Sequence, residues 1–285
     1  MLDASWHMDP ARSGRDEFTL QRIPTAQYFD INEVADQASK FPHTFPPAAV
    51  QSAAARHFGL ERTKQVVVYE AGSLFSAPRA WWTLKHMGFD VKIMAGGLQA
   101  WLAAGAEVDL EPREAPALES LYNQADQASC TPSGVIDFED MQAIILSIQN
   151  QSRDSERWVL DARSSGRFEG TSPEPRPGIR SGHMPGSKNV PFTSLIAPET
   201  GAMLTTEELQ AVFEGCGVPV TPTATYTTTC GSGVTAAVVL LALHECGVSW
   251  EKLQLYDGSW LEWASRGGSI SPSLSDNTGV EERAP

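Results

Sequence analysis

Short hydrophobic runs rich in β-branched residues alternate along this chain with longer stretches in which apolar residues recur at helical spacing. Residues 65–69 (QVVVY) have the pattern of a strand, and residues 47–59 (PAAVQSAAARHFG) and 205–217 (TTEELQAVFEGCG) have the pattern of helices. Strands that alternate with helices indicate βα units, in which each helix connects neighbouring parallel strands. The pattern therefore predicts an α/β fold with mostly parallel sheets flanked by helices.

The chain also contains an internal repeat. Three segments of the first half match three segments of the second half in the same order, at a spacing of about 160 residues. The matching pairs are MLDASW (1–6) with VLDARS (159–164), RIPTAQYFDI (22–31) with HMPGSKNVPF (183–192), and IMAGGLQAWLAAG (93–105) with LYDGSWLEWASRG (255–267). In a chain of 285 residues, such a repeat predicts two tandem domains of similar fold.

The repeat sets the expected domain boundaries. We expect the first domain at residues 1–106, a linker at 107–134 and the second domain at 135–269, each domain with a parallel sheet flanked by helices. Residues 270–285 have the composition of a disordered tail. The second domain carries a helix and spacer ahead of its first repeated strand, at residues 134–158, that the first domain lacks. The first domain is therefore expected to lack an opening element, because it is reduced or because the natural start of the chain is missing.

Composition narrows the range of functions. The formal charge of −14 and the lack of a basic cluster argue against a nucleic-acid partner, since Lys and Arg supply most of the affinity for phosphates. No stretch reaches the ~18 apolar residues of a membrane span, and the first residues do not resemble a secretory leader. Four widely spaced cysteines disfavour a metal site or a disulfide framework. We expect a protein without metal or membrane contact in the reducing cytoplasm, or in the mitochondrial matrix if the natural N-terminus is missing.

One cysteine stands in a context that predicts reactivity. Residues 225–247 (TYTTTCGSGVTAAVVLLALHECG) run from a β-prone stretch through a glycine-rich turn into an apolar helix, with Cys230 in the turn. Backbone N–H groups at a helix N-terminus have no partner within the helix, so they stabilise an anion such as a thiolate or a persulfide. Gly231 and Gly233 allow the turn to direct several N–H groups at the sulfur. The aligned residue of the first half is Glu70, which supplies no thiol.

The remaining cysteines are expected to be ordinary structural residues. Cys216 and Cys246 lie within helical patterns and Cys130 lies in the linker, and free cysteines are commonly buried. A cysteine-dependent phosphatase is disfavoured, because such enzymes carry a phosphate-binding arginine six positions after the cysteine and this chain has Ala236 there.

These features resemble the two-domain rhodanese family. The resemblance covers about residues 2–268 and rests on the tandem repeat together with FSAPRAWW, GHMPGSKNVPF, CGSGVTA and YDGSW. It implies that each half has a rhodanese fold, that the first domain is catalytically silent, and that Cys230 carries a transferable sulfur. It implies no cofactor. Glu70 at the nucleophile position fits a silent first domain.

The resemblance also implies residues that bind the substrate. The family's substrate-binding arginines correspond to Arg167 and Arg176, which lie in a Pro- and Gly-rich segment after the LDAR strand. Their guanidinium forks suit a carboxylate. The residues of the cysteine loop expected to contact the substrate are Gly231, Gly233, Val234 and Thr235.

The family is described with a proton relay from a loop serine through a histidine to an acidic residue of the first domain. Ser232 matches the serine and His43 matches the histidine. The acid has no match, because Asn32 stands in its place. An amide cannot stabilise a charged imidazole as a carboxylate does, so the relay is expected to be weaker, or to be completed by Asp30 or Asp36.

Two residues of the cysteine loop distinguish between sulfur donors. Family members that use thiosulfate resemble CRKGVTA, where basic residues compensate the compact dianion, whereas this chain has Gly231 and Ser232. The loop is similar to that of members that act on 3-mercaptopyruvate, whose carboxylate lies away from its sulfur. The expected reaction is sulfur transfer from 3-mercaptopyruvate to a thiol acceptor such as thioredoxin, or to cyanide, with release of pyruvate. Two alternatives stay open: transfer from thiosulfate to cyanide, and a non-catalytic binding module of rhodanese fold.

Several further residues are expected to have structural roles. Trp81 and Trp82 of FSAPRAWW are expected to close the contact between the two domains. Arg163 and Arg180 are expected to form surface salt bridges. Asp257 is a candidate for orienting the cysteine loop.

Overall fold

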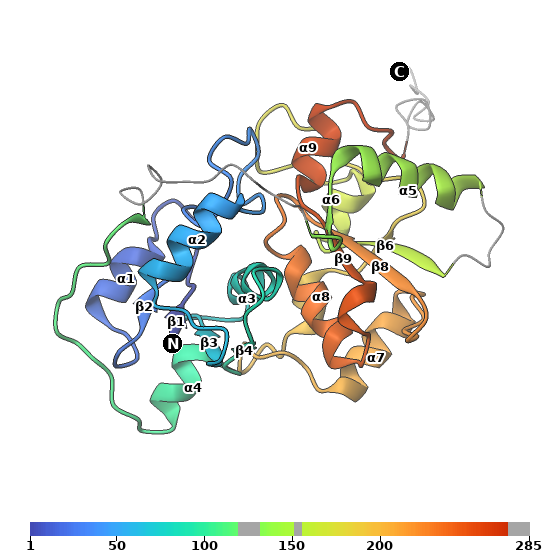
Figure 1. Ribbon diagram of the computed structural model, residues 1–285. Coiled ribbons are helices and arrows are strands. Elements are labelled where there is room, and N and C mark those ends of the chain that lie inside the picture. Colours follow the sequence, from blue (N-terminus) through green and yellow to red (C-terminus); the bar gives the residue numbers. More distant parts are fainter. Residues whose placement is uncertain (119–131, 151–155, 273–285) are drawn as a thin grey trace, which may run out of the picture.

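The computed structural model describes residues 1–118, 132–150 and 156–272, which form two parallel sheets covered by helices (Figure 1). The first sheet has the strand order β2-β1-β3-β4. Its strands are β1 (Leu2–Asp3), β2 (Gln27–Tyr28), β3 (Val66–Tyr69) and β4 (Val91–Ile93). The second sheet has the order β5-β9-β8-β6-β7. Its strands are β5 (Val135–Ile136), β6 (Arg157–Asp161), β7 (Lys188–Asn189), β8 (Thr225–Thr229) and β9 (Leu253–Tyr256). The expected α/β architecture is confirmed.

The helices follow the apolar patterns of the sequence. Those of the first half are α1 (Gly14–Leu20), α2 (Ala48–His57), α3 (Ala77–His86) and α4 (Gly97–Ala103). Those of the second half are α5 (Phe138–Asn150), α6 (Ser165–Glu169), α7 (Thr206–Gly215), α8 (Ala236–Glu245) and α9 (Ser259–Ser265), with the 3-10 turns η2 (Phe192–Leu195) and η3 (Trp250–Lys252). The start of α7 is fixed by a capping box, in which Thr205 and Glu208 exchange hydrogen bonds between side chain and backbone.

The two sheets repeat one another. The order β2-β1-β3-β4 of the first half corresponds to β7-β6-β8-β9 of the second, and every pairing is parallel. The second sheet continues past β9 with β5, in which Val135 pairs with Leu255. Among the described residues, the first sheet has no strand beyond β4. The first half therefore has the smaller version of the repeated unit.

Part of the predicted linker packs on the first half. An antiparallel bridge joins Arg22 to Asp109, and Leu118 is buried. Residues 119–131 of the predicted linker and residues 273–285 of the predicted tail lie outside the described residues. The boundaries proposed from the repeat stay a prediction.

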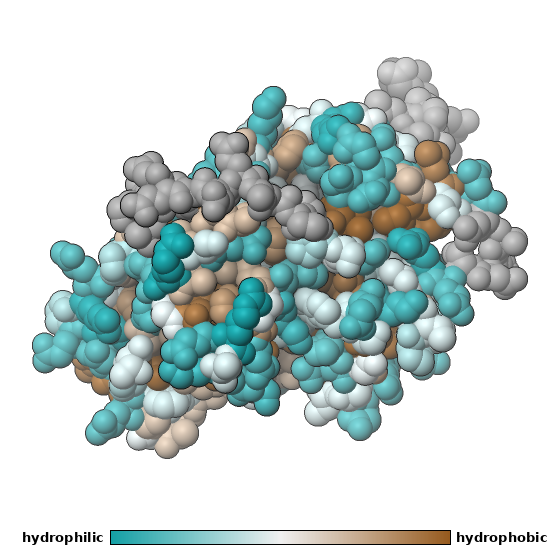
Figure 2. Space-filling model, viewed as in Figure 1, coloured by the Kyte–Doolittle hydropathy of each residue, from teal (hydrophilic) through white to brown (hydrophobic). Residues whose placement is uncertain are grey.

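The surface agrees with the acidic, polar composition of the chain. The face seen in Figure 2 is mostly hydrophilic or neutral, with smaller hydrophobic areas between. In the described parts of the chain, no helix is both long enough and apolar enough to cross a membrane.

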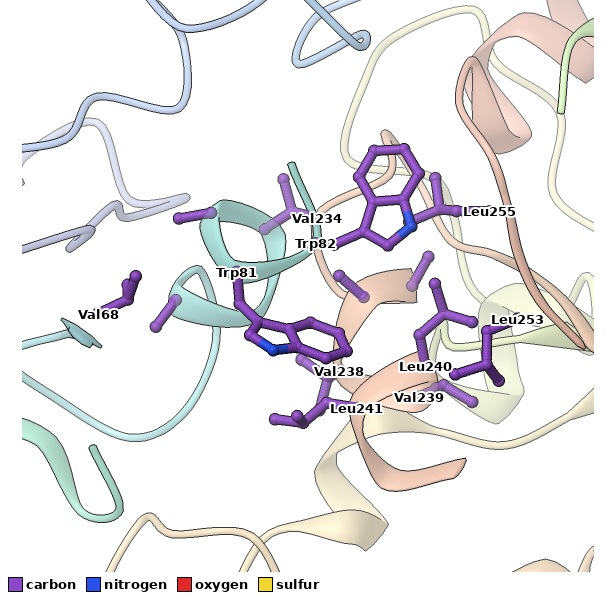
Figure 3. Close-up of a cluster of buried hydrophobic side chains, with 14 of the residues drawn as sticks. Val68, Trp81, Trp82, Val234, Val238, Val239, Leu240, Leu241, Leu253 and Leu255 are labelled. Carbon is purple, nitrogen blue, oxygen red and sulfur yellow. The ribbon is translucent and has the colours of Figure 1, made fainter. Parts of the chain in front are cut away.

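The main hydrophobic core joins the two halves through α3 and α8. Residues 236–243 of α8 are all buried, and α8 packs against α3. Figure 3 shows the rings of Trp81 and Trp82 on the side of α3 that faces α8. The ring of Trp81 also lies 5.5 Å from that of Trp250 in the second half. The expectation that these tryptophans close the contact between the halves is confirmed.

Both α3 and α8 begin in a loop that leaves the end of a central strand, but the two loops hold different groups. In the first half, β3 ends at Tyr69, and the carboxylate of the next residue, Glu70, lies inside the loop that follows. It accepts hydrogen bonds from the backbone N–H groups of Phe75 at 2.8 Å, Ser76 at 3.0 Å and Ala77 at 3.3 Å. The Ser76 hydroxyl lies 3.0 Å from the same carboxylate. The loop is thus an anion cradle that the chain fills with its own side chain.

Glu70 makes the stability of the fold depend on pH. Burial raises the pKa of Glu70 to about 7, although the donors of its loop act in the opposite direction. In the unfolded chain a glutamate titrates near pH 4.3, so between about pH 4 and pH 7 the folded protein holds a proton that the unfolded protein has lost. Stability conferred by this group is present below that window and falls as the pH rises through it.

We predict that Glu70→Gln removes this dependence, because the amide keeps the shape but does not titrate. Between pH 5 and pH 8, the wild type is expected to lose on the order of 3 kcal/mol of unfolding free energy relative to the variant. Urea denaturation at both pH values measures the difference, with Glu61→Gln as the control at an exposed glutamate. The prediction would be contradicted if the difference in unfolding free energy between Glu70→Gln and the wild type were the same at both pH values.

Candidate functional site

A cavity of about 240 Å³ lies over the cysteine loop, where the two halves meet. The second half contributes most of the predicted site to its wall: Arg167, Arg176, Cys230, Gly231, Ser232, Val234 and Thr235. The first half contributes Trp6, Met8 and Phe75. Three larger cavities among the described residues, of about 370, 540 and 640 Å³, have no cysteine in their walls. The nucleophile, and not the volume, therefore identifies the candidate site.

Cys230 sits between the end of β8 and the start of α8, as the sequence predicts. Its side chain is 2% exposed, and its Sγ accepts a hydrogen bond from the backbone N–H of Gly233 at 3.1 Å. Gly233 has a φ of +82°, a conformation that residues with a Cβ rarely adopt. Gly233 itself does not line the cavity and contributes through its backbone N–H. The geometry is that of a helix N-terminus whose loop directs one backbone N–H at the sulfur among the described contacts, where the sequence predicts several.

The other described cysteines lack such a setting. Cys216 and Cys246 are half-buried and free. Burial raises the pKa of the Cys216 thiol and raises that of Cys246 to about 11. Both stay protonated near neutral pH and are weak nucleophiles. Cys130 lies outside the described residues.

The two predicted substrate arginines both reach the cavity, but only one is engaged by the protein. Arg167, on α6, forms a two-pronged ion pair with Glu174, at 3.1 Å from Nε to Oε1 and 2.5 Å from NH2 to Oε2. Its NH2 also lies 3.0 Å from the position of a Cβ added to Gly231, so the guanidinium packs directly over the cysteine loop. Arg176 is exposed and makes no ion pair among the described residues. Of the two arginines that line the cavity, Arg176 is therefore available to bind an anion, whereas Arg167 is already paired with a carboxylate.

The expectation for Arg163 and Arg180 is wrong. Arg163 is buried, and it pairs with Asp161 at 2.5 Å and with Glu174 at 2.8 Å. Its burial follows from its place directly after β6, where its guanidinium lies 4.1 Å from the centre of the Trp260 ring. Arg180 donates to the backbone carbonyl of Pro272 at 2.8 Å and has no salt bridge in the described part of the chain.

The predicted relay residues are only partly brought together. Ser232 lines the cavity, whereas His43 is buried behind its wall, with its ring edge-on to Trp6 at 4.9 Å. No hydrogen bond between Ser232 and His43 is present among the described contacts, and Nδ1 of His43 has no partner there. Burial, aided by the charges of Arg79 and Arg176, lowers the pKa of His43 to about 3. The imidazole is therefore neutral at neutral pH.

The candidates for the acidic end of the relay have other partners among the described contacts. Asn32 is exposed, and its backbone N–H donates to Asp30. The carboxylate of Asp30 pairs with Arg15 at 3.1 Å, and that of Asp36 accepts the backbone N–H of Ala38. None of the three contacts the His43 ring in the described structure. The relay stays a prediction.

Arg79 is a residue of the site that the sequence patterns did not reveal, because FSAPRAWW has the composition of a structural, aromatic segment. Arg79 is 2% exposed and reaches from α3 into the second half. It pairs with Asp257 at 2.9 Å and donates to the carbonyl of Gly233 at 3.3 Å. The available signal was a charged residue inside an apolar, aromatic run, since such residues are rarely buried without a partner. Asp257, the candidate for orienting the loop, is that partner.

Comparison with known proteins places this site in a family. The family model for the rhodanese-like domain matches residues 11–104 and 146–266. A 3-mercaptopyruvate sulfurtransferase of Escherichia coli K12 is 39% identical over 256 residues, covering 90% of this chain and 84% of that protein. The human 3-mercaptopyruvate sulfurtransferase is 36% identical over 270 residues, covering 93% of this chain and 85% of that protein.

Solved structures show the same arrangement. The crystal structure of the Tum1 protein from Saccharomyces cerevisiae has a TM-score of 0.80 and 30% identity, covering 94% of this chain and 88% of that one. The crystal structure of SseA from Escherichia coli, described as a 3-mercaptopyruvate sulfurtransferase with the rhodanese fold, has a TM-score of 0.73 and 34% identity, with 91% of each chain covered. The chain therefore belongs to the rhodanese family and carries two rhodanese domains in tandem.

Proposed function

We propose that this protein is a sulfurtransferase that takes sulfur from 3-mercaptopyruvate onto Cys230 and passes it to a thiol acceptor such as thioredoxin, or to cyanide. The observation that carries the proposal is the Gly233 N–H directed at the sulfur of Cys230, which lines a cavity together with Arg176, a cation without an ion-pair partner among the described residues. The names of the relatives support the choice of donor, because the similar proteins of Escherichia coli and human are 3-mercaptopyruvate sulfurtransferases.

The first step is a nucleophilic displacement at sulfur. The Cys230 thiolate attacks the thiol sulfur of 3-mercaptopyruvate and forms an S–S bond while the C–S bond breaks. The electron pair of the broken bond goes to the departing carbon, which leaves as the enolate of pyruvate. The proton of the substrate thiol ends on that carbon, so pyruvate leaves and Cys230 remains as a persulfide anion. An acceptor thiolate then attacks the outer sulfur and regenerates the Cys230 thiolate.

The cysteine loop supports both charged states of this cycle. The Gly233 N–H lies within hydrogen-bond distance of the sulfur, and the N-terminus of α8 adds its positive end. These groups are fixed before the reaction, so no reorganisation is needed when negative charge develops. Because Cys230 is only 2% exposed, the outer sulfur of a persulfide has to extend into the cavity.

The arginines account for selection of an organic donor. Arg176 has no ion-pair partner in the described structure, so it is the first anchor for a carboxylate. Arg167 is held by Glu174, and a substrate carboxylate has to compete with that pair. The loop positions next to Cys230 are Gly231 and Ser232, which offer no cation close to the attacked sulfur. This arrangement favours a donor whose charge lies several bonds from its sulfur.

The other residues predicted from the sequence, and the predicted compartment, belong to the same proposal. Ser232 is the member of the predicted relay that lines the cavity, and the buried His43, whose ring lies edge-on to Trp6, stays neutral at neutral pH. The three described cysteines are free, which supports a reducing compartment such as the cytoplasm or the mitochondrial matrix. One relative from Arabidopsis thaliana, 34% identical over 278 residues, is a mitochondrial thiosulfate/3-mercaptopyruvate sulfurtransferase, and it keeps thiosulfate as the alternative donor to be tested.

We predict that Cys230→Ser abolishes sulfur transfer from every donor and leaves the fold intact, because serine has nearly the same volume but forms no persulfide. Pyruvate release and thiocyanate formation measure the two half-reactions, and far-UV circular dichroism checks the fold. The matched control is Cys246→Ser, which is expected to keep wild-type turnover. Turnover by Cys230→Ser at the wild-type rate would rule out the mechanism.

Comparison of the two donors tests the role of Arg176. The wild type is expected to have a higher kcat/KM with 3-mercaptopyruvate than with thiosulfate. In Arg176→Ala, we expect KM for 3-mercaptopyruvate to rise by about tenfold to a hundredfold through loss of a charge-assisted hydrogen bond, and KM for thiosulfate to rise much less. Arg180→Ala, whose side chain does not line the cavity, is the control. An equal rise in KM for both donors would argue against anchoring of a carboxylate by Arg176. A wild type with a higher kcat/KM for thiosulfate would favour the alternative donor.

A further inference from the structure

A buried cation from the first domain lies against the cysteine loop of the second. Arg79 is in the first turn of α3 and is 2% exposed. Its guanidinium pairs with Asp257 at 2.9 Å and lies 4.6 Å from the centre of the Trp82 ring. A guanidinium withdrawn from water this completely needs an anion and hydrogen-bond acceptors around it. Asp257, 178 residues away in the sequence, supplies the anion.

The same guanidinium holds Gly233, the residue whose N–H points at the sulfur. Arg79 NH1 donates to the Gly233 carbonyl at 3.3 Å, while the Gly233 N–H donates to Cys230 Sγ at 3.1 Å. The position of a Cβ added to Gly233 lies only 2.9 Å from Arg79 NH1, so the guanidinium packs directly against this glycine. Both polar groups of Gly233 are thus engaged, one by the first domain and one by the nucleophile.

Glycine at this position needs such support. At a φ of +82° its backbone has ready alternatives, because glycine accepts a wider range of conformations than other residues. Rotation of the Gly233 backbone would turn its N–H away from the sulfur. A hydrogen bond from a buried guanidinium, itself fixed by Asp257, opposes that rotation.

Arg79 and Asp257 also fix the segment that contains His43. Arg79 NH2 donates to the His43 carbonyl, and Asp257 Oδ2 accepts the backbone N–H of Phe45 at 2.5 Å. His43 has a φ of +61°, which is uncommon for a residue with a side chain and persists where neighbouring contacts impose it. One ion pair therefore holds the histidine segment of the first half and the cysteine loop of the second.

We propose that Arg79 is a positioning residue for the transfer of sulfur: held by Asp257, it keeps the Gly233 N–H on the sulfur of Cys230. This inference rests on the proposed function of Cys230 and deepens it. It gives the first domain, which has no nucleophile of its own, a direct part in the reactivity of the second. Arg79 touches neither the sulfur nor the cavity and acts only through Gly233.

The test uses a readout that does not depend on the identity of the donor. The full-length protein is reduced, and alkylation of Cys230 by iodoacetamide at a fixed pH is followed by mass spectrometry of the peptide that contains it. Arg79→Met keeps the length and apolar stem of the side chain but removes the guanidinium. We expect the alkylation rate and kcat with 3-mercaptopyruvate each to fall by about tenfold to a hundredfold, with KM changed by only a few-fold.

Two further variants keep the test decisive if Arg79→Met does not fold. Arg79→Lys keeps the charge but lacks the fork that reaches Asp257 and Gly233 together, so its alkylation rate should lie between those of Arg79→Met and wild type. Asp257→Asn still accepts the N–H of Phe45 but removes the anion that holds Arg79, and it should slow alkylation in the same direction. The double variant Arg79→Met/Asp257→Asn should alkylate Cys230 no more slowly than Arg79→Met does, because both substitutions act through one contact.

The matched control is Arg22→Met, which removes another buried arginine of the first domain. Arg22 is 1% exposed and pairs with Asp109 at 2.6 Å, and none of its hydrogen bonds involves the cysteine loop. This variant should lower stability and leave Cys230 alkylation unchanged.

Folded Arg79→Met and Asp257→Asn proteins that alkylate and turn over at wild-type rates would overturn the positioning role. The positioning role would also be overturned if Arg22→Met slowed the alkylation of Cys230 as much as Arg79→Met does, because the effect would then follow from lost stability alone. A wild type that transfers no sulfur from any donor would contradict the proposed function instead. The ratio of the Cys230 alkylation rates of the Arg79 variants and the wild type would still test the positioning role of Arg79.

Discussion

The packing of α3 against α8 is the contact on which the candidate site depends. Each helix begins directly after the loop that ends a central strand, so burying their apolar faces together brings the two loops of the repeat to one interface. The cavity over Cys230 consequently takes Trp6 and Phe75 from the first half and its nucleophile from the second. Neither half alone encloses this cavity. The hydrophobic contact between the domains is therefore also what shapes the site.

The two loops show how one backbone arrangement serves two purposes. Three backbone N–H groups hold the residue that follows the strand in the first loop, and the N–H of Gly233 contacts the corresponding residue in the second. In the first half the chain fills the cradle with the Glu70 carboxylate, which leaves no room for an external anion. In the second half the corresponding group is the sulfur of Cys230, which in the proposed reaction accepts and releases a second sulfur atom. Both copies of the repeat therefore direct backbone N–H hydrogen bonds at this position, and only the second copy has a thiol there.

Sequence patterns predicted the features that depend on local order. Alternating strands and helices, the matching halves and the position of Cys230 before α8 could all be recognised from neighbouring residues. Arg167 and Arg176 were placed by family resemblance, and both line the cavity. The pairing of Arg79 with Asp257 could not be predicted, because its partners are 178 residues apart and meet only when the two domains dock. The ion pair between Arg167 and Glu174 likewise depends on how loops fold in three dimensions.

The central claim is that sulfur travels through Cys230, and mass spectrometry of the loaded protein tests it most directly. The reduced protein is mixed with 3-mercaptopyruvate in the absence of an acceptor, and the released pyruvate is quantified. The protein is then digested without reductant, and the masses of its cysteine-containing peptides are measured. The account predicts one added sulfur atom on the peptide that contains Cys230, in an amount equal to the pyruvate. Pyruvate released while Cys230 stays unmodified, or sulfur found on Cys216 or Cys246 instead, would contradict it.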